Sequence, residues 1–216
     1  MSLDSPTAAI DRFFRLYFSH SVAPDQDTLL NLLNGLHGLN DKLQKDVGRN
    51  LFASSNFIAL KALRNLFHHH VELIHDIKIM PVSDLPPMTT DLLVVCLVPA
   101  DLIEQAATET DRRYREQVRS AFAAFKRYGS IVNIQPCLFN VAVDVFELVA
   151  KLNVTPSSDA YMAFEQSYKF EEANGHDHRV SGNIWCSAGS VTEVLQKVFG
   201  QAARMRTLTS LVDNQS

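Results

Sequence analysis

A cluster of basic and polar side chains interrupts the apolar stretch from residue 55 to residue 79. The segment 63–70 reads LRNLFHHH, in which Arg64, Asn65 and His69 form the pattern Arg-Asn-x-x-x-His. On a helix, Asn65 and His69 lie one turn apart on the same face, so the amide can orient the imidazole. Arg64 and His69 are five residues apart, which separates them by about 140° around the helix axis. A neutral imidazole can act as a general base, and a guanidinium can bind a phosphate and stabilise its extra charge. The trio therefore predicts metal-independent cleavage of RNA, with the 2′-hydroxyl as the nucleophile.

This pattern resembles the Arg-x4-His motif of the HEPN superfamily (higher eukaryote and prokaryote nucleotide-binding), in which a polar residue, often Asn, follows the Arg. The resemblance covers one helix and implies a helical domain that forms a homodimer and brings two motifs into one cleft. Many members are metal-independent endoribonucleases of toxin–antitoxin, phage-defence and RNA-processing systems. The resemblance thus implies an RNA substrate and an antitoxin or another protein as a partner.

The resemblance also implies roles for single residues. His69 would be the general base or acid, Arg64 the phosphate ligand, and Asn65 would orient the site. Because three histidines are consecutive, His68 or His70 would assist if the register shifts by one. One HEPN branch has a Tyr two residues beyond the His that a partner enzyme can modify; here Val71 stands at that position, so this form of regulation is not supported.

Two groups of side chains suggest a metal site instead. His68, Glu72 and His75 share a face at i, i+4 and i+7 if the helix continues through them, which would suit mononuclear zinc or iron. A loop carries His176 and His178 before Cys186, although a solvated loop is the simpler interpretation. A di-iron bundle would need a second Glu-x-x-His pair, which this chain lacks. The main hypothesis involves neither a metal nor another cofactor.

An arginine-rich segment follows the middle of the chain. Arg112, Arg115 and Arg119 would share one face of a helix and could follow an RNA backbone. The same stripe is also typical of the solvated side of an amphipathic helix. The net charge of −4 and the absence of a second catalytic signature favour a different class altogether, a non-catalytic helical module that binds a protein.

The elements that position these residues are expected to be helical. Apolar spacing predicts helices over residues 6–20, 25–36, 55–79, 101–128, 138–152, 160–172 and 191–202. Residues 1–80 would form the N-terminal helices, 81–100 a Pro-rich linker with a short apolar segment, and 101–216 the C-terminal helices. We expect one compact domain.

The apolar segment 92–98 can be a buried strand or a buried helical turn. Because no partner strand is evident, helix or irregular structure is favoured. The prediction is therefore an all-α bundle of about seven helices with a HEPN-like core.

The apolar runs, the N-terminal residues and the cysteines together indicate the cellular compartment that we expect. The longest apolar run has seven residues, far below the roughly 20 of a membrane span, and the N-terminus carries no signal-peptide pattern. The three cysteines are far apart and odd in number, so no disulfide framework is indicated. The expectation is a cytoplasmic protein without a membrane partner.

Overall fold

The computed structural model describes residues 5–152, 154–187 and 189. Its elements follow the chain in this order: α1 (Pro6–Val22), α2 (Gln26–Val47), α3 (Ser55–His69), η1 (Val71–Asp76), β1 (Lys78–Pro81), η2 (Val82–Asp84), β2 (Met88–Thr90), β3 (Val94–Pro99), α4 (Ala100–Glu109), α5 (Arg115–Ala123), β4 (Lys126–Tyr128), β5 (Ile131–Asn133), α6 (Gln135–Val149), α7 (Asp159–Asn174) and β6 (Ile184–Cys186).

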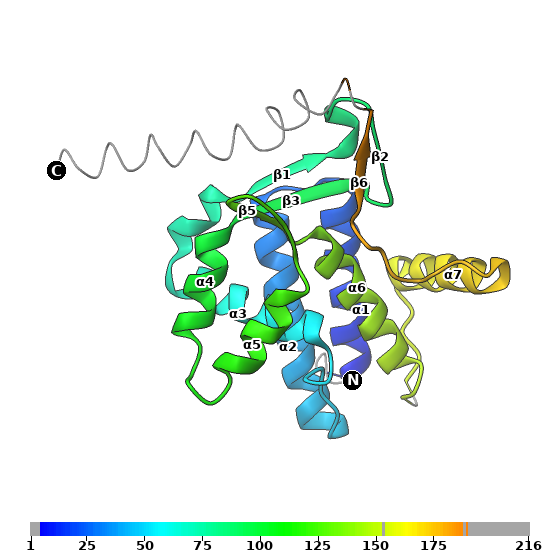
Figure 1. Cartoon of the computed structure of the whole chain (residues 1–216). Coiled ribbons are helices and arrows are strands. Elements are labelled where there is room, and N and C mark those ends of the chain that lie inside the picture. The colour runs from blue at the N-terminus through cyan, green and yellow to red at the C-terminus, as the bar shows by residue number, and fades with distance from the viewer. Residues whose placement is uncertain (1–4, 153, 188, 190–216) are drawn as a thin grey trace.

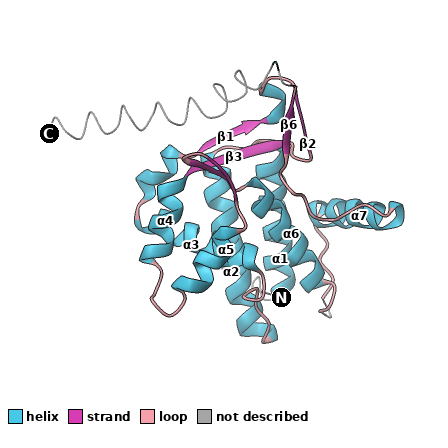
Figure 2. Cartoon of the chain, viewed as in Figure 1, coloured by secondary structure: helices cyan, strands magenta, loops and turns pink. Residues whose placement is uncertain are grey.

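The helices α1, α2, α3 and α6 run alongside one another, and a small sheet lies across one end of them (Figure 1). Helix α3 is central, since it contacts α2, α4, α5 and α6, whereas α7 packs against α1. The strands gather at the sheet end of the molecule, and the rest of the fold is helical (Figure 2).

Polar side chains begin the N-terminal helices as the sequence predicts. Ser5 accepts a hydrogen bond at the start of α1, where Pro6 occupies the first turn. Asp25 and Thr28 form a reciprocal capping box at the start of α2, and Ser54 caps α3. These contacts satisfy backbone N–H groups that have no partner inside the helix.

One face of α3 forms the middle of the hydrophobic core. The side chains of Phe57, Leu60, Leu63 and Phe67 are at most 1% exposed. Burying side chains of this size drives the packing of the neighbouring helices. The polar residues of α3 are consequently left on its opposite face.

The expected all-α fold is wrong, because the chain also forms two antiparallel sheets. The larger has the strand order β1-β3-β5-β4, and the smaller pairs β2 with β6. Segment 92–98, for which helix or irregular structure was favoured, contains most of β3, and every residue of that strand is buried. Its partners are residues 78–81 and 131–133. The sequence placed the first of these at a helix end and the start of the linker, and it predicted no element for the second. Three- and four-residue strands carry too little periodicity to reveal such pairing.

Two predicted helices are also shorter than expected. The helix predicted over 101–128 divides into α4 and α5, because Thr110 is extended and the Asp111 carboxylate accepts a hydrogen bond from the Arg113 backbone N–H. The helix predicted over 55–79 ends at His69 and continues as the 3₁₀ helix η1. The helix predicted over 191–202 lies outside the described residues.

Among the helices in the described ranges, none has the length and apolar character to cross a membrane.

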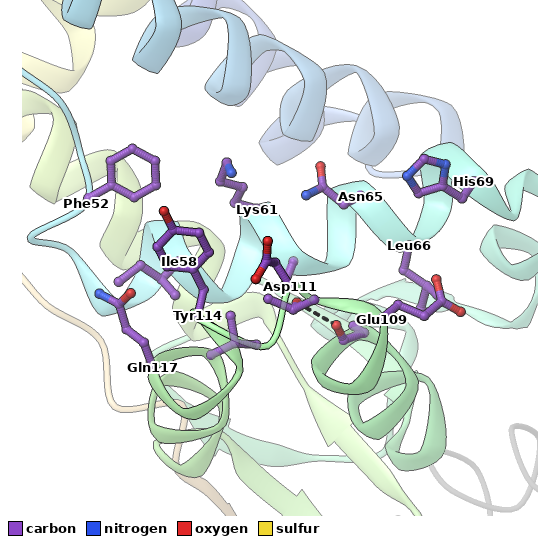
Figure 3. A pocket seen from close by; sticks show the side chains of 14 residues that line it. Phe52, Ile58, Lys61, Asn65, Leu66, His69, Glu109, Asp111, Tyr114 and Gln117 are labelled. Atoms are coloured by element: carbon purple, nitrogen blue, oxygen red, sulfur yellow. Dashed lines mark hydrogen bonds between the residues drawn. The ribbon is translucent and has the colours of Figure 1, made fainter.

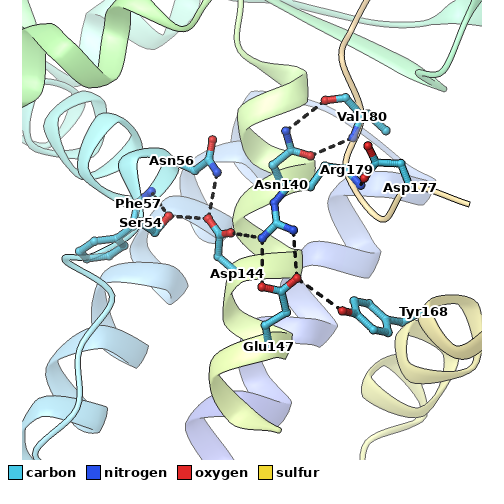
Figure 4. A network of polar contacts seen from close by, with 10 residues as sticks. All are labelled: Ser54, Asn56, Phe57, Asn140, Asp144, Glu147, Tyr168, Asp177, Arg179 and Val180. Carbon is cyan, nitrogen blue, oxygen red and sulfur yellow. Dashed lines mark hydrogen bonds and ion pairs between the residues drawn. The ribbon is translucent and has the colours of Figure 1, made fainter. Parts of the chain in front are cut away.

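A polar network holds the segment after α7 against α6 (Figure 4). The Arg179 guanidinium contacts Asp144 at 2.8 Å and Glu147 at 3.0 Å, and Asp144 also accepts hydrogen bonds from Ser54 and Asn56. The hydrogen bond from Arg179 is the main reason that the pKa of Glu147 is lowered. The network thereby joins the start of α3, the middle of α6 and the segment around residue 179.

Removing this guanidinium should destabilise the fold measurably. We expect Arg179→Ala to lower the free energy of unfolding by about 1–2 kcal/mol, because it leaves two partly buried carboxylates without their cation. Arg113→Ala is the matched control, since the Arg113–Asp111 pair is largely exposed and should contribute much less to stability. Urea denaturation of both variants measures the difference, and equal losses would contradict this role of Arg179.

Candidate active site on helix α3

The polar face of α3 carries the three residues of the sequence motif in its last two turns. Arg64 and Asn65 are half-buried, and His69 is exposed. Asn65 and His69 both line a pocket between α3 and the α4–α5 connection, whereas Arg64 lies outside it, toward α2. The structure therefore brings two of the three motif residues to one cavity and places the third beside it.

Arg64 is held by two amides. Its Nε donates to Asn34 Oδ1 of α2 at 2.9 Å, and its Nη1 donates to Asn65 Oδ1 at 3.4 Å. Asn65 thus orients the guanidinium rather than the His69 imidazole, which differs from the role expected for it. Two contacts on a planar, permanently charged group fix its position at the edge of the pocket.

The pocket has a volume of about 480 Å³ and two chemically different walls (Figure 3). Lys61, Asn65 and His69 follow one another at intervals of four residues along its α3 side. Opposite them lie two carboxylates, those of Glu109 and Asp111. Phe52, Ile58, Tyr114 and Gln117 gather at the end away from His69.

Both carboxylates of the opposite wall have a nitrogen atom of a neighbouring side chain within contact distance. His70 Nε2 lies 3.1 Å from Glu109 Oε1, and Arg113 Nη2 lies 2.9 Å from Asp111 Oδ2. The hydrogen bonds from Arg113 are the main reason that the pKa of Asp111 falls to about 2. The Arg113 guanidinium therefore reduces the repulsion that Asp111 would exert on a phosphate at the α3 side.

The histidines next to His69 differ in their surroundings. His68 is exposed, and the centres of the His68 and His69 rings are 5.5 Å apart. His70 is the C-cap residue directly after α3, and its contact with Glu109 links it to α4. Of the two residues expected to assist, His68 thus lies beside His69 and His70 is occupied elsewhere.

Two residues of α2 that the sequence did not predict lie close to the motif. Asn34 binds Arg64, and His37 lies close enough to Arg64 and Lys61 for both to lower its pKa, although burial lowers it more. Thirty residues separate Asn34 from Arg64, so no local spacing could reveal this contact. Lys61 belongs to α3 itself, and helical spacing could have related it to the motif, because it precedes Asn65 by one turn.

The arginines expected to bind RNA do not form a helical stripe. Arg112 lies in the turn before α5, Arg115 donates to the carbonyl oxygens of Thr108 and Thr110, and Arg119 is exposed on α5. Arg115 therefore binds the end of α4, and of the other two arginines only Arg119 belongs to α5.

The alternative metal ligands are not arranged as a site either. His68 belongs to α3 whereas Glu72 and His75 belong to η1, so the single helical face that the metal hypothesis requires does not exist. His178 pairs with Glu171 rather than with His176 or Cys186. Within residues 5–152, 154–187 and 189, no group of three or more His, Cys, Asp or Glu side chains could hold a metal ion.

Comparison with known proteins gives no family to which this site can be referred. No family model, no curated protein and no solved structure matches the chain.

Proposed function

We propose that this protein is a metal-independent endoribonuclease whose active site is the polar face of α3. The observation that carries the proposal is an exposed imidazole on the wall of a pocket, together with a guanidinium that two amides hold, one of which, Asn65, lines the same pocket. An acid–base group beside a fixed cation is what phosphodiester transesterification requires. The proposal rests on these residues and not on an all-helical fold.

The residues would act as follows. The neutral imidazole of His69 accepts the proton of the 2′-hydroxyl as its oxygen attacks the phosphorus. Arg64 and Lys61 stabilise the extra negative charge of the phosphorane. The bond from phosphorus to the 5′-oxygen breaks, and the protonated imidazole of His68 donates to the leaving oxygen. The products are a 2′,3′-cyclic phosphate and a 5′-hydroxyl.

The pocket gives the nucleotide next to the scissile phosphate a place to bind. With the phosphate at the cationic edge, the base can reach the end where Phe52 and Tyr114 are 43% and 54% exposed. Exposed aromatic rings stack on bases without strong preference among them. Gln117 at the same end adds an amide that can bind a base edge.

Cleavage of a matched pair of oligonucleotides tests the proposal. Wild-type protein in excess EDTA should cleave a single-stranded RNA and leave the DNA of the same sequence intact. The double variant Arg64→Ala, His69→Ala, purified in the same way, reports contaminating nucleases. Cleavage that persists in the double variant, or intact RNA with the wild-type protein, would refute the proposal.

A further inference from the structure

A second cavity lies on another side of the molecule, between α1, α6, α7 and the residues that lead into β3. Its volume is about 420 Å³, within the range typical of small-molecule sites. None of its lining residues belongs to α3 or to the pocket beside it. Nothing in the proposed nuclease mechanism uses this cavity.

The cavity contains a buried amide with an unused hydrogen-bonding atom. Gln135, the first residue of α6, is 8% exposed and lines the cavity. Its backbone N–H donates to Asn133 Oδ1, but its side-chain Oε1 has no hydrogen-bond partner among the described residues. A buried polar atom without a partner destabilises a fold, so such atoms are rare unless they serve a ligand or water.

The walls around this amide suit a flat, apolar molecule. Phe139, Val143 and Phe164 line the cavity, and so does Tyr168, whose ring stacks on His178 with 3.6 Å between centres. The Tyr168 hydroxyl donates to Glu147, which restrains the ring further (Figure 4). Aromatic side chains that line a cavity bind planar apolar groups through their edges as well as their faces.

The charges around the cavity exclude an anionic ligand. Asp91 and Glu171 line it, and the only basic lining residue is His178, whose Nδ1 lies 3.0 Å from Glu171 Oε2. Tyr17 adds a phenol hydroxyl, which is un-ionised at neutral pH, and burial raises its pKa to about 12. A phosphate or carboxylate would meet two acids and no free cation among these described residues.

We propose that this cavity binds an uncharged planar heterocycle that carries a lactam or amide edge. The ring lies between the aromatic and aliphatic walls, and its N–H and C=O groups pair with the Gln135 side-chain amide, which offers one acceptor and one donor. The site is independent of the nuclease site, and either assignment can fail without the other.

Two probes of nearly equal size and shape test this binding. 2-Quinolone has a lactam edge, whereas quinoline has only a ring nitrogen. We expect the wild-type protein to bind 2-quinolone about tenfold or more tightly in ligand-observed NMR titrations, because quinoline leaves part of the buried amide unpaired. Equal affinities, or no binding of either probe, would overturn the proposal.

Substitution of Gln135 separates a binding role from a structural one. Gln135→Met keeps the length of the side chain and removes its polar atoms, so it should abolish the preference for 2-quinolone and raise the melting temperature. Gln117→Met, in the pocket beside α3, is the matched control and should leave the preference unchanged. A preference that survives in Gln135→Met, or a lower melting temperature, would contradict the role of this amide.

A second variant tests the cavity without changing the amide. Ser167 is an exposed residue of α7 that lines the cavity. Ser167→Trp fills the cavity from its outer side and should abolish binding of both probes. Retained binding would place the probes elsewhere and overturn the assignment.

Discussion

His69→Ala is expected to slow RNA cleavage in EDTA by about 10³-fold, within the range for removal of a general acid–base group. The side chain is exposed and makes no hydrogen bond in the described structure, so its loss should leave the melting temperature unchanged. His68→Ala should slow cleavage less, because water can protonate the leaving oxygen in its place. Initial rates at saturating RNA concentrations measure both effects.

A histidine of the same neighbourhood provides the control. His75 lies on η1, is exposed, and does not line the pocket. His75→Ala should therefore cleave RNA at the wild-type rate. If His69→Ala and His75→Ala lose activity equally, or neither loses any, His69 is not the general base.

The second large effect concerns stability and pH. His20 of α1 is 1% exposed; its Nδ1 lies 3.0 Å from Thr28 Oγ1, and its Nε2 is buried without a partner among the described residues. Burial lowers its pKa from 6.5 to about 4. Between these values the unfolded chain binds more protons, so the free energy of unfolding should fall as the pH drops from 6.5 to 4. The loss reaches about 3 kcal/mol at the lower end.

The effect must be separated from that of carboxylates, which also titrate in acid. His20→Gln removes the titrating group. The free energy of unfolding of the wild-type protein, relative to that of this variant, should therefore fall as the pH drops from 6.5 to 4. His176→Gln, at an exposed loop position, should retain the full wild-type pH dependence. Parallel curves for wild-type and His20→Gln in urea denaturation from pH 7 to pH 4 would contradict the account.

The sequence predicted well the helices that have clear caps and long apolar stripes. The starts of α1 and α2 follow from Ser5 and from Asp25, and α6 begins at Gln135, slightly before the start near residue 138 that its apolar spacing predicts. The sheet could not be predicted in the same way. β1, β4 and β5 are too short to show alternation, and each is a strand only because β3 or β5 lies beside it.

The candidate site was predicted in part for a similar reason. Arg64, Asn65 and His69 are close in sequence, so helical spacing was enough to relate them. The partners of Arg64 on α2 and the acids on the α4–α5 connection come from distant segments, and only the tertiary fold brings them near. Gln135 gave no signal at all, since an isolated glutamine becomes informative only when it is seen to be buried without a partner.

The chemical nature of the RNA ends tests the central claim most directly. An RNA oligonucleotide cleaved in EDTA is analysed by mass spectrometry, together with a copy that lacks the 2′-hydroxyl at the cleaved position alone. We predict a 2′,3′-cyclic phosphate on the upstream fragment, a 5′-hydroxyl on the downstream fragment, and no cleavage at the 2′-deoxy position. A 5′-phosphate product, or cleavage at the 2′-deoxy position, would show that the 2′-hydroxyl is not the nucleophile and would contradict the mechanism assigned to His69 and Arg64.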